Sequence, residues 1–146
     1  MRSHVPHQAV FISLAIGCVS LLVSMASEAA QVQGTLVTWH PLTVDFTGPE
    51  ANERDDAPNP FLDYRLNVEW TAPSGQTVLV PGFFAGDGTG GSTGAIWRVR
   101  FAPDEPGTWS YTARFRSGED IAISLDADAG AATDFDGESG TVDIAP

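Results

Sequence analysis

The chain has 146 residues, with 19 acidic side chains against 7 basic ones and a formal net charge of −12. A surface of this charge repels phosphate backbones and anionic lipid headgroups, so neither nucleic acid nor a membrane surface is an expected partner. The single cysteine, Cys18, excludes an intramolecular disulfide and a cluster of thiolate metal ligands.

The N-terminal segment has the order of a secretory signal peptide. Arg2 precedes an apolar run over residues 9–23, and small residues follow up to Ala29. We expect residues 1–29 to be removed, by cleavage after Ala29 or Ala26. A membrane anchor is the alternative, but the run is shorter than the roughly 20 apolar residues that span a bilayer. The predicted domain is residues 30–146, secreted to the periplasm or the cell exterior and free of the membrane after cleavage.

The rest of the chain shows the period of two that is typical of β-strands. Apolar and polar residues alternate in 64–70, 97–101 and 109–116, and more briefly in 44–46, 77–80 and 141–144. Glycine- and proline-rich turns separate these runs, including Thr47-Gly48-Pro49 and the stretch from Gly86 to Gly94. About seven strands in one domain predict an all-β, immunoglobulin-like β-sandwich, with a small barrel as the alternative.

Three further segments complete the expected layout. Residues 50–60 are polar and read as a loop, residues 121–125 are a candidate strand, and residues 126–136 read as a flexible acidic loop. The acids of this last tract do not keep the spacing of a calcium loop, so no metal or other cofactor is predicted. The tryptophans are expected in the core: Trp39, Trp70, Trp97 and Trp109.

Four blocks of the sequence resemble a known family. They are residues 38–48 (TWHPLTVDFTG), 59–66 (NPFLDYRL), 80–88 (VPGFFAGDG) and 97–111 (WRVRFAPDEPGTWSY). Together they are similar to DUF5060 domains over about residues 35–146. The resemblance implies an immunoglobulin-like domain of the kind found N-terminal to glycoside hydrolase-like barrels in secreted bacterial proteins. Because members commonly continue into a catalytic domain, a chain ending at Pro146 is either a fragment or a stand-alone copy.

No catalytic residue is predicted. His40 is the only histidine after the N-terminal segment, and no serine lies in a nucleophile-elbow motif that it could serve as base. A glycosidase needs two carboxyl groups held across a cleft, which a small sandwich offers no deep groove to build. We therefore expect a domain that is not an enzyme on its own.

A candidate carbohydrate-binding group lies at Phe83, Phe84 and Asp87, where two aromatic residues precede a glycine-rich loop. Adjacent residues of a strand point to opposite faces, so one phenylalanine is expected at the surface. The leading hypothesis is a non-catalytic accessory domain that docks beside or positions a glycoside hydrolase-like module. The alternatives are an independent carbohydrate-binding module, with a polysaccharide as partner, and a protein-adhesion or cell-surface structural domain.

Overall fold

Nine strands and one short 3₁₀ helix make up the computed structural model, which describes residues 29–146. The elements are β1 (Gln31–Gly34), β2 (Leu42–Asn52), β3 (Tyr64–Thr71), β4 (Thr77–Pro81), β5 (Phe83–Phe84), β6 (Thr93–Phe101), β7 (Gly107–Ser117), η1 (Ile121–Ile123), β8 (Ala131–Ala132) and β9 (Ser139–Ile144). The predicted signal peptide lies outside the described residues except for Ala29. Within the described part of the chain, no helix is long and apolar enough to cross a membrane.

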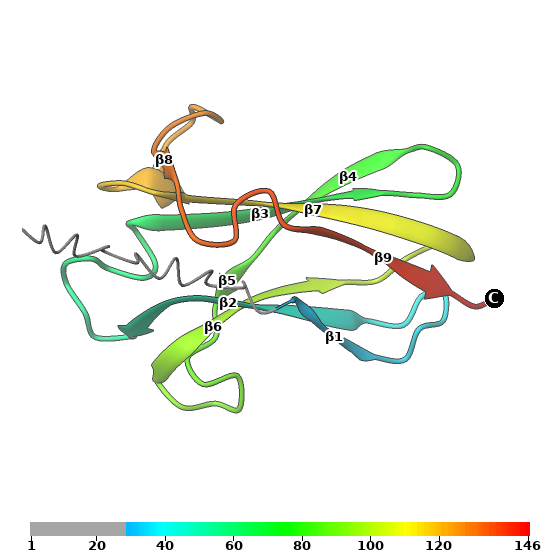
Figure 1. Cartoon of the computed structure of the whole chain (residues 1–146), viewed down its shortest axis with the longest axis horizontal. Coiled ribbons are helices and arrows are strands. Elements are labelled where there is room, and N and C mark those ends of the chain that lie inside the picture. The colour runs from blue at the N-terminus through cyan, green and yellow to red at the C-terminus, as the bar shows by residue number, and fades with distance from the viewer. Residues whose placement is uncertain (1–28) are drawn as a thin grey trace, which may run out of the picture.

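The strands form two antiparallel sheets that face each other (Figure 1). One sheet has the order β1-β2-β6-β5. The other has the order β4-β3-β7-β8. Strand β8 pairs with the C-terminal end of β7, and β9 pairs with the first half of β7. The all-β prediction is confirmed. The alternation marked six of the nine strands, because the short strands β1, β5 and β8 carry no alternating pattern, and the candidate strand at 121–125 is instead the helix η1.

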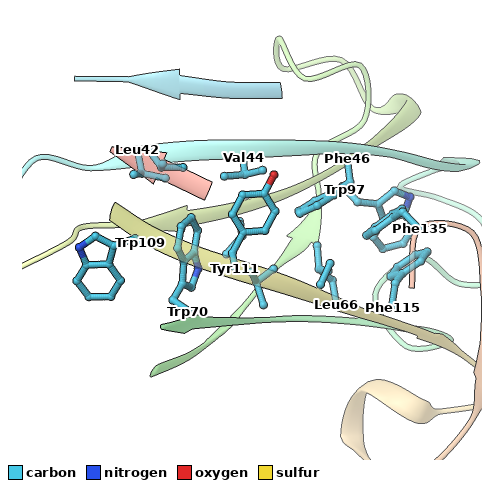
Figure 2. Packing of buried hydrophobic residues seen from close by; sticks show 14 of the residues in the cluster. Leu42, Val44, Phe46, Leu66, Trp70, Trp97, Trp109, Tyr111, Phe115 and Phe135 are labelled. Atoms are coloured by element: carbon cyan, nitrogen blue, oxygen red, sulfur yellow. The ribbon is translucent and has the colours of Figure 1, made fainter. Parts of the chain in front are cut away.

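The inward faces of both sheets contribute to one apolar core. In β7 the alternating residues Trp109, Tyr111, Ala113 and Phe115 are all buried, while their neighbours point to solvent. Figure 2 shows the labelled aromatic and aliphatic side chains lying between the strands of the two sheets. Trp70, Trp97 and Trp109 belong to this core, as predicted.

Strand β2 continues through the residues that were expected to form a turn. Its register against β6 shifts between Thr47 and Ala51, so a bulge accommodates Gly48 and Pro49 inside the strand. A side chain at Gly48 has no room, since a Cβ there would lie 2.7 Å from Trp97 and 2.9 Å from Phe135. The turn prediction at 47–49 was therefore wrong, and the loop predicted from residue 50 begins only after Asn52.

The acidic segment after η1 is anchored to the domain. Phe135 is only 3% exposed and stacks between Phe46 and Phe115, with ring centroids 4.7 and 4.3 Å away. Arg116 donates hydrogen bonds to the carbonyl oxygens of Asp128 and Gly130. The segment expected to be a flexible loop therefore begins over the outer face of the five-stranded sheet, continues along the edge of β7, and closes one end of the core with Phe135.

Candidate functional site

A groove opens where the chain crosses from one sheet to the other, between β4 and β5. It has a volume of about 230 Å³, and its lining includes Phe61, Asn67, Pro81, Phe83 and Phe84. Gly82 makes the crossing, and its N–H donates to the carbonyl oxygen of Leu66 at 2.8 Å. We call this hollow the aromatic groove.

The two phenylalanines of β5 lie on opposite faces of their strand, as the alternation predicted. Phe83 is 41% exposed, whereas Phe84 is 4% exposed and belongs to the core. The Phe84 ring lies 5.2 Å from Trp97 and meets Phe61 edge-on at 6.3 Å. Phe83 is therefore available to a ligand at the rim, while Phe84 supports the groove from inside.

Asp87 does not line the aromatic groove. Its Oδ1 accepts hydrogen bonds from the backbone N–H groups of Thr89 and Gly91, at 2.7 and 2.8 Å. These bonds favour the ionised carboxylate and hold the pKa of Asp87 below its ordinary value. The geometry gives this side chain a role in ordering the β5–β6 loop.

Phe61 and Asn67 line the groove but were not among the site residues predicted from the sequence. Phe61 is 49% exposed, and its backbone N–H donates to the side-chain oxygen of Asn59 in the loop before β3. Asn67 lies on the outer face of β3 opposite Pro81. The alternation of β3 already placed Asn67 outward, but no local signal joined it to Phe61 and Phe83, because the three come together only through the β4–β5 crossing.

A larger hollow of about 590 Å³ lies beside the groove, and four acids contribute to its lining: Asp56, Asp63, Glu119 and Asp120. The Asp63 carboxylate accepts the N–H groups of Asn59 and Asp120, at 2.7 and 3.0 Å, and these bonds lower its pKa. Asp63 thus ties two loops together. No group of three metal-ligating side chains occurs in residues 29–146.

Trp39 departs from the prediction that all four tryptophans are buried. It is 73% exposed, in the loop between β1 and β2, and its φ of 65° is left-handed. The backbone N–H of Trp39 donates to the carbonyl oxygen of Pro103, and the backbone N–H of Thr38 donates to the carbonyl oxygen of Ala145. This loop lies at the end of the domain that carries the C-terminus (Figure 1). Leu36, in the same loop, is 38% exposed.

The fold and these surfaces define a two-sheet, all-β domain with an aromatic groove on one side and an exposed tryptophan at one end. The profile of the family described as "Domain of unknown function (DUF5060)" matches residues 35–116. The chain belongs to the DUF5060 family.

The other comparisons add one solved structure. It is a crystal structure described as a "putative glycoside hydrolase from Bacteroides vulgatus ATCC 8482", with 23% sequence identity and a TM-score of 0.49. The match covers 78% of this chain and 16% of that one, so this chain spans about a sixth of that protein. No curated protein matches.

Proposed function

We propose that this chain is a non-catalytic accessory domain of a secreted carbohydrate-active protein, and that it docks onto a glycoside hydrolase-like module through Leu36 and Trp39. Membership of the DUF5060 family supports this context, since the resemblance implies domains that precede such modules. In this proposal the two sheets form an immunoglobulin-like sandwich, and residues 1–29 direct export to the periplasm or the cell exterior.

The observation that carries the proposal is the state of Trp39. A bulky residue in the left-handed region is strained by about 1–3 kcal/mol. The flanking hydrogen bonds from Thr38 to Ala145 and from Trp39 to Pro103 hold the backbone in this conformation. Yet the side chain is 73% exposed, so it returns little packing energy to its own domain. Trp39 is thus an exposed apolar side chain on a strained backbone, and exposed apolar surface of this kind marks a site that binds a partner.

The position of Trp39 fits a module that follows or adjoins the domain. Its loop pairs with Ala145 through a parallel bridge at Val37, so the tryptophan and the last strand share one end of the sheets. Tryptophan is enriched among the residues that contribute most to binding at protein interfaces. A module docked at this end would bury the Trp39 ring.

The test uses protein recovered after export from the full-length gene, together with the glycoside hydrolase-like module encoded in continuation of this reading frame or beside it. We expect a one-to-one complex by calorimetry, and Trp39→Ala should weaken it about 30-fold, the factor that corresponds to a 2 kcal/mol hot spot. Leu125→Ala is the matched control, because Leu125 is fully exposed and lies in the connection between β7 and β8. Strand β8 lies at the end of the domain away from the C-terminus (Figure 1).

Three results would contradict the docking role. The first is a locus that encodes no glycoside hydrolase-like module, and the second is the absence of a complex between the two proteins. The third is equal binding by the Trp39→Ala and Leu125→Ala variants. Circular dichroism of both variants shows whether the fold is intact.

A further inference from the structure

The aromatic groove is separate from the Trp39 surface and has the features of a small ligand site. Its volume of about 230 Å³ is below the roughly 300–1,000 Å³ of pockets that hold drug-sized ligands. It therefore suits a single ring of a longer molecule. Ligand sites combine aromatic walls with a few polar groups that fix orientation, and this groove has both.

Two partly exposed rings supply the apolar walls. Phe61 and Phe83 are 49% and 41% exposed, and both contribute to the groove lining. The buried Phe84 supports the first of them, since it meets the Phe61 ring edge-on at 6.3 Å. The guanidinium of Arg100 lies 5.5 Å from the centre of the Phe83 ring, a cation–π contact that steadies Phe83. The rings are thus held in place while part of their surface stays open.

The polar contribution comes from Asn67. Its side-chain amide makes no hydrogen bond within residues 29–146, although the residue is partly buried in the groove lining. An amide offers one acceptor oxygen and two N–H donors. These groups complement hydroxyls, each of which both donates and accepts. Asn67 is therefore free to orient a ligand that carries hydroxyl groups.

The charge at the groove favours an uncharged ligand. Within residues 29–146 no carboxylate lines it, although the chain carries 19 acids. Arg65 does line it, but its guanidinium already donates to the carbonyl oxygens of Ile121, Ser124, Asp126 and Ala127. Because its N–H groups are directed to these carbonyl oxygens, the Arg65 side chain lines the groove but does not provide an anion-binding site. The net charge of −12 also repels polyanions.

We propose that the aromatic groove binds one pyranose ring of a neutral glycan. The C–H faces of the sugar pack on Phe61 and Phe83, and its hydroxyls exchange hydrogen bonds with Asn67. A pyranose meets both requirements of the groove, since it is apolar on its faces and polar at its edge. This binding does not depend on the docking role of Trp39, and the two proposals use different surfaces of the domain.

The experiment titrates the exported protein with neutral cello-, xylo-, manno- and laminari-hexaoses and with an oligogalacturonate, followed by NMR chemical shifts. At least one neutral hexaose should shift the resonances of groove residues. Phe61→Ala and Phe83→Ala should each weaken that binding at least about tenfold, as expected for the loss of a central aromatic contact. Asn67→Ala should weaken it as well, without loss of the native spectrum.

Trp39→Ala is the control that separates the two proposals, and it should bind the hexaose as the wild type does. The inference is overturned if no neutral hexaose binds, if only the oligogalacturonate binds, or if the groove variants bind like the wild type. Loss of sugar binding in Trp39→Ala, with binding kept in the groove variants, would also overturn it by placing the site at the other surface.

Discussion

Replacing Phe135 by alanine tests whether the acidic segment is part of the core. The ring is 3% exposed and is stacked at 9° to both Phe46 and Phe115. Removing a buried phenylalanine ring costs about 3–5 kcal/mol, because the apolar surface is lost and a cavity remains. With a urea m-value of about 1.5 kcal/mol/M for a domain of this size, the unfolding midpoint should fall by roughly 2–3 M.

The assay is urea unfolding followed by tryptophan fluorescence and by circular dichroism. Leu125→Ala is the control, because this fully exposed leucine lies just before the acidic segment, in the connection between β7 and β8, and should change the free energy of unfolding by less than about 0.5 kcal/mol. A loss below about 1 kcal/mol in Phe135→Ala would mean that the ring does not fill the core, and the described packing of the segment would be refuted.

Three other substitutions test local features. Trp39→Asn should keep or raise the free energy of unfolding, by up to about 1 kcal/mol, because asparagine tolerates the left-handed region; a clear loss in urea unfolding would contradict the strain argument. Asp63 has a lowered pKa in the folded state, so its contribution is present above the ordinary value of 3.8 and is lost as the pH falls further. Asp63→Asn should therefore differ from the wild type in thermal stability at pH 7 but hardly at pH 2, and a difference that is independent of pH would refute this. Asp45→Asn should cost about 1.5–3 kcal/mol in urea, because the carboxylate accepts two hydrogen bonds from Arg98 in a largely buried pair, whereas Asp128→Asn on the outer face should cost under about 1 kcal/mol; equal losses would contradict the ranking.

Strands with one buried face were the predictable part of the fold. In β3 and β7 each inward position is apolar and each outward position is polar or small, so the period of two marks them directly. The opposite orientations of Phe83 and Phe84 follow from the same rule. The path of β2 was not predictable, because Gly48 and Pro49 read as a turn unless the bulge against β6 is known.

Tertiary partners decided the features that the sequence reading missed. Phe135 stands in an acidic, glycine-flanked stretch that reads as solvated, and only the rings of Phe46 and Phe115, from distant strands, bury it. Trp39 precedes a strand and reads as apolar core, but hydrogen bonds from its loop to residues 103 and 145 turn it outward. The aromatic groove likewise gathers residues from four separate segments, so no local pattern marked it.

Quenching of tryptophan fluorescence by acrylamide gives the most direct test of the docking role. Of the four tryptophans, Trp70, Trp97 and Trp109 are at most 3% exposed, and Trp39 is 73% exposed. A neutral quencher should therefore reach one tryptophan in the free domain, and Trp39→Phe should remove the quenchable fraction. Adding the glycoside hydrolase-like module, itself substituted to lack tryptophan, should protect Trp39 from acrylamide. Undiminished quenching of Trp39 in a complex shown to have formed would contradict the proposed docking surface.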